Sequence, residues 1–542
     1  MATEPAQRRS PLAVGRLRVA RLSPADADDL AELFERNAVE SVTDSFDPFP
    51  LTPATAQALT TAAGHDRFLG GRLDGRLVAF AMLRGWDQGF AVPSFGVLVD
   101  VEHQGRGIGR AVTEWAREES RGLGCPRLRL SVYRHNLRAH GLYVSLGFRE
   151  VVRRPPTAAD PRERIVMELE LDVTPIPVAA PALVGNELAY VKDCLESTWI
   201  AGGPYIARFE RAFADFCEVE HAVSCCNGTA ALHLALLAAG VEPGDEVILP
   251  ALTYVACANA IVACGAVPVL ADVDRATWNL DPVCVAAAVT PRTRAILAVH
   301  LYGHPADMDA LRAIADRHDL LLIEDAAEAH GARYRGRVAG SVGDVAAFSF
   351  FGNKILTTGE GGMVVTSDAE IASKARLLAG QGQDPGRRYW HVVRGFNYRM
   401  TNVAAAIGVA QLERAEYHLA RRHAVARSYR SALAGVAGVE LAPEADWARS
   451  AHWMTAVHLT RAGVARDDVI RLLAEHGIDT RPFFPPIHLL PPYADAAAPG
   501  ALGVSEELGR AGLCLPTFAD LDDRDVERVA LTLDHVLRMR AP

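Results

Sequence analysis

Residues 320–331 of the chain read LLLIEDAAEAHG. Four apolar residues followed by Glu324 and Asp325 predict a buried strand whose carboxyl end carries acidic side chains. Helical segments separate this run from earlier strand-like runs, which comprise 246–249, 267–271 and 295–300. Strands that alternate with crossover helices form a right-handed, mostly parallel sheet, and open α/β sheets bind ligands at the carboxyl ends of their strands. The sequence therefore predicts an α/β fold with Asp325 at a ligand-binding edge.

The composition limits the classes of protein to which the chain can belong. Its 542 residues suggest about three to four folding units, and half of the residues are apolar. The apolar stretch 230–241 is shorter than a membrane span, the N-terminus lacks an apolar signal segment, and the nine cysteines contain no CxxC pair. We therefore expect a cytoplasmic protein without a metal site. The net charge of −10 lies entirely after residue 173, which disfavours nucleic acids and membranes as partners.

Lysine is rare in this chain. Of its 56 basic residues, only Lys192, Lys354 and Lys374 are lysines. Lys192 and Lys374 lie in polar stretches with helical spacing, which predicts exposed positions. Lys354 lies in FSFFGNKILTTGEGGM (348–363), between an aromatic run and a group of glycines. Because burial of a charged amine is costly, these surroundings favour the neutral, nucleophilic form of Lys354 that a Schiff base requires.

Three further features fit an enzyme that uses pyridoxal phosphate. The Asp325 carboxylate can keep a pyridine nitrogen protonated, so that the ring withdraws electrons. Gly228 and Thr229 open an apolar helix in NGTAAL (227–232), where free amides suit a phosphate. Tyr254 follows a predicted strand and can cover the ring. Taken singly, Asp325 could instead be a helix cap and Tyr254 a core residue.

Several motifs together resemble one family. NGTAAL, GDEVILPALTY, IEDAAEAHGA, FSFFGNK, GEGGM and GFNYRMTN are similar to the DegT/DnrJ/EryC1/StrS sugar-nucleotide aminotransferases, of pyridoxal phosphate fold type I, over residues 184–542. The resemblance implies that Lys354 bonds the cofactor, that Asp325 pairs with its ring nitrogen, and that Glu328 lies near its ring hydroxyl. It also implies that Gly228, Thr229 and Ser349 hold the phosphate. Asn397 would reach the phosphate of a neighbouring subunit, so a homodimer with a shared site, or a higher oligomer, is expected.

Other stretches resemble the perosamine-synthase branch of that family. They are STWIAGGPY (197–205), VHLYGHPADMDA (299–310), GQDPGRRYWH (382–391) and TRPFFPPIHLLPPY (480–493). The resemblance implies amination at carbon 4 of a nucleotide-linked 4-keto-6-deoxy sugar, with GDP favoured over dTDP or UDP and L-glutamate as the amino donor. The residues that would bind this substrate are Trp199, Arg388, Arg481 and His488.

A second glycine-rich loop precedes a helix in the first part of the chain, at QGRGIGR (104–110). Glycines allow the backbone to approach a ligand, and the amides of the helix start can bind phosphate oxygens. The loop is a poor match to the dinucleotide-binding pattern, since no acidic residue ends a following strand.

Residues 15–172 resemble the GCN5-related N-acetyltransferase (GNAT) family instead, because NLRAHGLY (136–143) and LGF (146–148) follow the loop. By this resemblance the loop binds acetyl-CoA through Gln104, Gly105, Arg106, Gly107, Ile108, Gly109 and Arg110. Asn136 would contact the cofactor arm, and Tyr143 would protonate the departing thiolate. Three residues, Asp100, Glu102 and His103, stay open as the base that deprotonates the acceptor amine.

A stretch rich in proline and alanine, 171–183, separates the two resemblances and predicts a linker. The expected organisation is a flexible N-terminus (1–14), an acetyltransferase domain (15–172), a linker (173–184), a large aminotransferase domain (185–425) and a small C-terminal domain (426–542). An aminotransferase produces the primary amine that an acetyltransferase consumes, so we predict consecutive amination and N-acetylation. Two alternatives stay open: an acetyltransferase for an unrelated amine, and a non-catalytic scaffold that binds the cofactor.

Overall fold

The computed structural model describes residues 17–62, 64–88, 90, 92–157 and 160–539, so the predicted flexible segment 1–14 lies outside the described residues. The described chain folds as two compact units. The first contains the residues up to Pro175 together with 472–477 and 527–539. The second contains 176–471 and 478–526. In the described part of the chain, no helix is both long and apolar enough to cross a bilayer.

The first unit is built on a seven-stranded sheet in the order β1-β2-β3-β4-β5-β7-β6. The strands are β1 (Leu17–Arg21), β2 (Arg67–Leu73), β3 (Arg76–Arg84), β4 (Ser94–Val99), β5 (Arg127–Tyr133), β6 (Arg149–Arg154) and β7 (Arg164–Glu170). All neighbouring strands are antiparallel except β4 and β5, which are parallel and pair only where Ser94 and Phe95 face Arg129 and Leu130. Beyond Phe95 these two strands no longer pair, so the sheet opens between their carboxyl ends.

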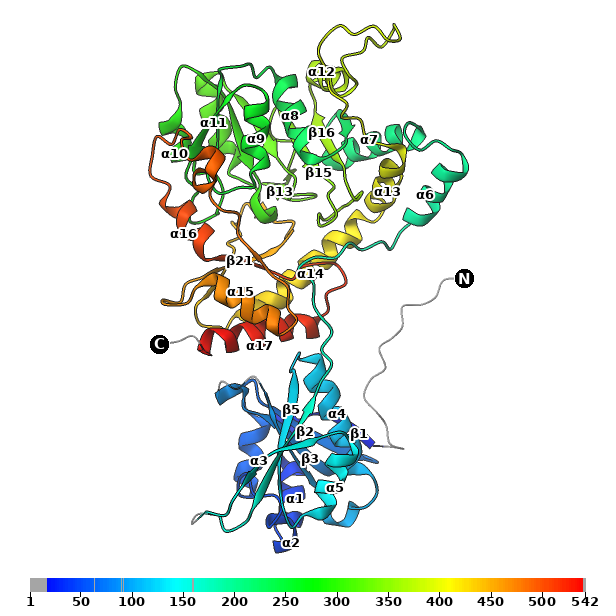
Figure 1. The fold of residues 1–542 in the computed structure, drawn as a ribbon, viewed down its shortest axis with the longest axis vertical. Helices are drawn as coiled ribbons and strands as arrows, with labels where there is room; N and C mark the ends of the chain where they lie inside the picture. The colour runs from blue at the N-terminus through cyan, green and yellow to red at the C-terminus, as the bar shows by residue number, and fades with distance from the viewer. Residues whose placement is uncertain (1–16, 63, 89, 91, 158–159, 540–542) are drawn as a thin grey trace. The chain divides into compact units, whose positions relative to one another are not determined.

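Helices cover both faces of this sheet (Figure 1). They are α1 (Ala27–Asn37), α2 (Glu40–Thr43), α3 (Pro53–Thr60), α4 (Ile108–Gly122) and α5 (Leu137–Ser145). Leu30 and Phe34 of α1 pack with Phe80 of β3 on one face. Val112 and Trp115 of α4 pack on the other face with the small residues of β3, because successive strand residues point to opposite faces.

The second unit contains the predicted parallel sheet. Its strand order is β10-β9-β11-β12-β15-β16-β8, and only β16 pairs antiparallel with its neighbours. The strands are β8 (His221–Cys225), β9 (Glu246–Pro250), β10 (Val267–Ala271), β11 (Thr293–Val299), β12 (Leu321–Asp325), β15 (Val345–Ser349) and β16 (Gly362–Thr366). The four strands expected from the sequence are confirmed as β9, β10, β11 and β12, and Asp325 is the last residue of β12.

Helices and a smaller sheet complete the second unit (Figure 1). The helices comprise α6 (Glu187–Glu196), α7 (Pro204–Cys217), α8 (Gly228–Ala239), α9 (Ala256–Ala263), α10 (Pro282–Ala288), α11 (Met308–His318), α12 (Ala369–Ala379), α13 (Asn402–Leu412), α14 (Ala415–Leu433) and α16 (Gly503–Ala511). The small antiparallel sheet has the order β17-β19-β21-β20, with bounds Val439–Leu441, Thr455–Leu459, Gly512–Leu515 and Arg481–Pro482. The remaining long helices of the C-terminal part are α15 (Arg466–Glu475) and α17 (Asp523–Met539).

A buried carboxylate holds the central strand β12 to its surroundings. Glu324 is fully buried and accepts hydrogen bonds from the amides of Gly340, Val342 and Gly343 at 2.6–2.8 Å. His300, at the end of β11, lies 2.8 Å from the same carboxylate through its Nε2. Burial alone would raise the pKa of Glu324, but these hydrogen bonds hold it below its usual value. The hydrogen bonds of the Glu324 carboxylate therefore connect β12 to β11 and to the loop before β15.

We expect Glu324→Gln to lower the free energy of unfolding by about 3 kcal/mol, because the amide group loses the charge that the three backbone donors stabilise. Urea unfolding at pH 7 measures this change. Glu370→Gln is the matched control: its exposed carboxylate pairs only with Lys374 of the same helix, so a change below about 0.5 kcal/mol is expected. Equal effects of the two substitutions would contradict the role of Glu324.

Candidate active sites

A turn with open backbone amides lies between β8 and α8. The Asn227 side chain accepts a hydrogen bond from the Ala230 amide at 2.8 Å, which leaves the amides of Gly228 and Thr229 open at the helix start. A methyl group added to Gly228 would lie 2.6 Å from the Cβ of Ser349, the last residue of β15. Gly228 therefore keeps the turn close to the Ser349 hydroxyl. Two backbone donors and a hydroxyl converge here, which suits a phosphate group.

A carboxylate occupies the end of β12, as the sequence predicts. Asp325 is buried, and its Oδ1 accepts a hydrogen bond from the Ala327 amide at 3.0 Å. The Cys257 thiol donates to its Oδ2, also at 3.0 Å. Burial raises the pKa of Cys257 well above its usual value, so the thiol keeps its proton and stays a donor. Cys257 was missed in the sequence, because a single cysteine inside the apolar helix α9 gives no signal.

Lys354 lies beside the carboxylate of Glu328. Its Nζ is 3.6 Å from Oε1 of Glu328 and 4.0 Å from the centre of the Trp453 ring. The Tyr302 amide donates to the other oxygen of Glu328 at 2.8 Å. Burial raises the pKa of Glu328 to about 7, although the nearby ammonium acts in the opposite direction. Glu328 can therefore gain or lose a proton near neutral pH.

Aromatic rings extend from Lys354 toward the surface. Tyr302 stacks on Trp453 with ring centres 6.4 Å apart and on Phe484 at 5.9 Å. Phe484 in turn lies 5.4 Å from Tyr254, which is 55% exposed. Sequence reasoning found only Tyr254. Tyr302 and Phe484 lie in motifs that carry the family resemblance and Trp453 does not, and no spacing rule indicates that the three rings meet.

The other predicted residues of this part lie on exposed or outlying segments. Asn397 is exposed and its backbone pairs with that of Gly380, and Trp199 is 59% exposed. Arg388 stacks on Tyr389, and Arg481 lies in the edge strand β20. His488 faces α16, where its Nε2 is 3.2 Å from Glu506. Among the described residues, none of these five side chains forms a hydrogen bond or ion pair with Lys354, Asp325 or Glu328.

The loop after β4 has the geometry of an anion-binding helix start. Gly105 and Gly107 both have φ of +82°, a conformation that side chains disfavour. No side chain caps α4, which begins at Ile108, and the Ile108 side chain is buried, so only its backbone faces outward. Gly109 packs near Val99 and Leu142.

The polar side chains of this loop face outward. Gln104, Arg106 and Arg110 are exposed. Gln104 donates to the Val99 carbonyl at 3.4 Å, and Arg110 donates to the Ser145 hydroxyl at 2.7 Å. The loop therefore offers both amides and positive charge to an anionic ligand.

Two predicted residues of this site lie on α5. The Asn136 oxygen caps the helix by accepting from the Ala139 amide at 3.1 Å. Tyr143 is buried against Phe148, and burial raises the pKa of its hydroxyl to about 12. At neutral pH Tyr143 therefore carries a proton that it can donate.

The three acceptor-base candidates already have partners. Asp100 is fully buried; it accepts from the Glu102 amide at 3.3 Å and from Arg36 at 3.4 Å. His103 lies 3.6 Å from Asp100, and Glu102 pairs with Arg76 at 3.3 Å. These contacts join the loop to α1 and β3.

Comparison with known proteins assigns both parts of the chain. A model of the DegT/DnrJ/EryC1/StrS aminotransferase family matches residues 181–534. The chain belongs to this family. A model of the acetyltransferase (GNAT) family matches residues 28–148, so the aminotransferase is fused to an N-terminal acetyltransferase domain. Both expected resemblances are confirmed, and with them the cofactor pyridoxal phosphate and the cosubstrate acetyl-CoA, which these two enzyme families use.

Relatives of the aminotransferase part match over nearly their whole length. A GDP-perosamine synthase of Caulobacter vibrioides is 54% identical over 369 residues, which cover 68% of this chain and 99% of that protein. A GDP-perosamine synthase of Vibrio cholerae is 44% identical over 356 residues, covering 65% and 97%. The crystal structure of S. venezuelae DesV is 42% identical with a TM-score of 0.61, covering 66% and 95%. This aminotransferase thus shares the fold type I architecture of its family.

We expect Gly228→Ala to weaken the binding of pyridoxal phosphate at least about tenfold, because the added methyl group would push the turn away from Ser349. Titration of the cofactor-free protein, followed by absorbance, measures the dissociation constant. Gly435→Ala is the control, since a methyl group there meets open space. Unchanged affinity in Gly228→Ala would place the phosphate elsewhere.

Proposed function

We propose that the aminotransferase part transfers an amino group from L-glutamate to carbon 4 of a GDP-linked 4-keto-6-deoxy sugar, and that the acetyltransferase domain acetylates the amine so formed. The observation that carries this proposal is the 54% identity to a GDP-perosamine synthase over 99% of its length. The fused acetyltransferase supports the second step, because amination yields the type of nucleophile that such a domain consumes.

The chain's own residues suit the first step. We assign the phosphate to Gly228, Thr229 and Ser349, the ring nitrogen to Asp325, and the face of the ring to Tyr254. Lys354 attaches the cofactor. Pyridoxal phosphate, when bound, supplies an electron-withdrawing ring.

Proton movement falls to Lys354 and Glu328. The Lys354 amine would carry a proton to or from the carbon that is aminated. Glu328 lies 3.6 Å from this amine and has a pKa of about 7, so it can hold the proton between steps. The Tyr302 amide fixes the orientation of the Glu328 carboxylate.

We assign substrate recognition to residues outside this cluster. Trp199, Arg388, Arg481 and His488 would bind the nucleotide sugar, and Asn397 would complete the phosphate site of a second subunit. All of these except His488 are exposed in a single chain, which is compatible with a homodimer whose active sites lie at the subunit interface.

The acetyltransferase domain has the parts required for the second step. The amides and cationic side chains of residues 104–110 suit the pyrophosphate of acetyl-CoA, and Asn136 would contact its arm. Transfer breaks a carbon–sulfur bond and leaves a thiolate. Tyr143, which stays protonated at neutral pH, would donate its proton to that thiolate.

We expect kcat/KM for amination to be at least about tenfold higher with a GDP-linked 4-keto-6-deoxy sugar than with dTDP- or UDP-linked ones, a difference of about 1.4 kcal/mol. Steady-state assays with L-glutamate measure it. Lys354→Ala should abolish amination, whereas Lys374→Ala, on an exposed helical position, should not. A preference for dTDP or UDP would overturn the nucleotide assignment, and a chain that binds cofactor but aminates no sugar would favour the scaffold alternative.

We expect the purified protein to release free CoA from acetyl-CoA when the 4-amino sugar nucleotide is added, and Tyr143→Phe to lower kcat about 100-fold because the thiolate loses its proton donor. Thiol titration measures the release. The reaction without amine is the blank. Release with unrelated amines but not with the amino sugar would favour the alternative acceptor.

A further inference from the structure

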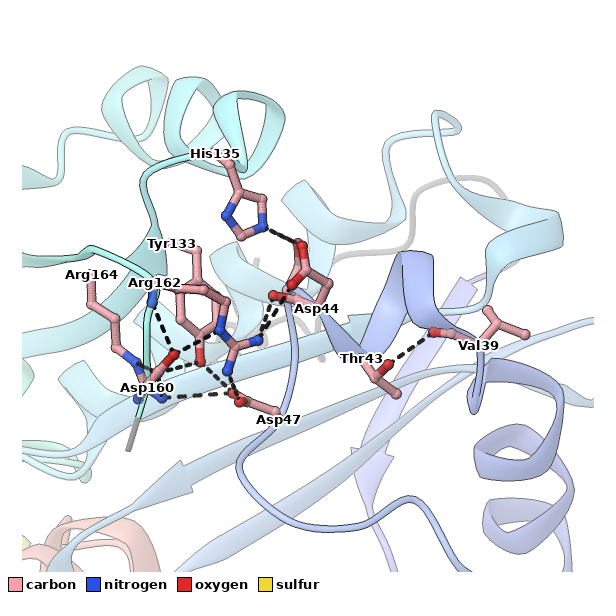
Figure 2. A network of polar contacts seen from close by, with 10 residues as sticks. Val39, Thr43, Asp44, Asp47, Tyr133, His135, Asp160, Arg162 and Arg164 are labelled. Atoms are coloured by element: carbon pink, nitrogen blue, oxygen red, sulfur yellow. Dashed lines mark hydrogen bonds and ion pairs between the residues drawn. The ribbon is translucent and has the colours of Figure 1, made fainter. Parts of the chain in front are cut away.

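A polar network joins three segments of the acetyltransferase domain: residues 44–47 after α2, the end of β5 with residues 134–135, and residues 160–164 (Figure 2). Tyr133 lies at its centre and is buried. Its hydroxyl donates to Asp47 at 2.6 Å, and the Arg162 guanidinium lies 4.2 Å from the centre of its ring. Arg162 also pairs with Asp47 and, at 2.8 Å, with Asp160. These bonds fix the position of the segment 44–47.

The inner groups of this network keep constant charges near neutral pH. Hydrogen bonds from Arg162 and Arg164 hold the pKa of Asp160 far below its usual value. Burial and the hydrogen bond to Asp47 raise the pKa of Tyr133. The network therefore acts as a fixed frame for the residue at its outer edge.

His135 occupies that edge (Figure 2). Its Nε2 lies 3.0 Å from Asp44 and 3.3 Å from the Ser45 hydroxyl, and its ring stacks on Tyr133 with an interplanar angle of 16°. The carboxylate partner places the ring proton on Nε2. Nδ1 has no hydrogen-bond partner among the described residues, and the side chain is 44% exposed, so this nitrogen is free to accept a proton.

The topology places His135 beside the acetyl-CoA loop. Strands β4 and β5 are parallel neighbours that separate after Phe95, so their carboxyl ends form one open edge. The loop 104–110 follows β4, and His135 follows β5 by two residues. Tyr143 belongs to the next helix, α5, and helical side chains point back toward the helix start, which lies next to His135.

We propose that His135 is the general base of acetyl transfer and that Asp44 is its positioning residue. This inference rests on the proposed N-acetylation. The ammonium group of the acceptor gives one proton to Nδ1 of His135. The free amine then forms a bond to the acetyl carbon, and the carbon–sulfur bond breaks. The thiolate takes the proton of Tyr143, the phenolate takes the second proton from the nitrogen, and His135 returns its proton to water.

The three base candidates named from the sequence, Asp100, Glu102 and His103, already interact with other side chains. Asp100 is buried and already accepts two hydrogen bonds, and His103 faces it with Nδ1. Glu102 pairs with Arg76. The charged groups that face His135 are Asp44 and Arg162, which lies 3.6 Å from the same carboxylate. They hold the imidazole without occupying Nδ1.

The test uses the full-length holoenzyme and measures CoA release with the 4-amino sugar nucleotide and with a panel of simple primary amines, as a function of pH. We expect His135→Gln to lower kcat/KM at pH 7 about 100- to 1,000-fold. In the wild-type protein activity falls on the acid side, because protonated His135 cannot accept a proton. In His135→Gln the rate should instead rise about tenfold per pH unit, since deprotonation of the amine in water then limits it.

Matched variants separate catalysis from structure. Asp44→Asn should lower kcat/KM about tenfold while leaving the KM for acetyl-CoA unchanged, and it tests the proposal even if His135→Gln fails to fold. His140→Gln is the control, because His140 also pairs with a carboxylate, Glu150 of β6 at 2.8 Å, but is not part of the network around Tyr133. It should behave like the wild-type protein. Transamination activity should stay unchanged in all three variants.

The outcomes distinguish this inference from the proposed function. Acetylation of an unrelated amine alone, with the rise of about tenfold per pH unit in His135→Gln, overturns the sugar acceptor and supports His135. Acetylation of the amino sugar with an unchanged pH profile in His135→Gln overturns the assignment of His135 alone. If the wild-type protein acetylates no amine, the proposed N-acetylation and the role of His135 are both wrong.

Discussion

Two adjacent carboxylates at the end of β12 define the aminotransferase site. Successive residues of a strand point to opposite faces, so Glu324 and Asp325 cannot serve the same surroundings. Glu324 is held by three loop amides and by His300, and this fixes the register and the end of the strand. Asp325 is thereby directed to the other side, where Cys257 donates to it. The cost of burying the first charge is offset by hydrogen bonds, and those bonds position the second charge.

In the acetyltransferase domain, too, a polar side chain is held in place at the end of a strand. Its parallel strands β4 and β5 pair over two residues only, and the opening between them provides the edge at which the glycine loop begins. Tyr133, the last residue of β5, is held by Asp47 and Arg162 as Glu324 is held by amides. In both parts, a buried polar group at a strand end fixes the position of a functional side chain one or two residues further along the chain.

The sequence predicts the strands, the glycine turns and Lys354, because each of these depends on local patterns. An apolar run that ends in an acidic residue predicts β12, and a lysine between aromatic residues and glycines predicts a buried amine. Tyr302, Trp453 and Phe484 could not be predicted in the same way. They come from segments far apart in the chain, and their meeting depends on tertiary packing. The contact between His135 and Asp44 could not be predicted either, because the strands β2, β3 and β4 lie between these two residues in the chain.

The shortage of lysine has a chemical consequence for a protein that binds a thioester. Amines react with acetyl groups when they lose their protons, whereas guanidinium groups stay protonated and inert. Lys354 lies beside Glu328 with 12% of its side chain exposed, and only Lys192 and Lys374 present exposed lysine amines in the described chain, each paired with a glutamate one helical turn away. A surface whose positive charge is carried by arginine therefore offers acetyl-CoA few competing nucleophiles. The enzyme's own surface is thus largely protected from modification by its cosubstrate.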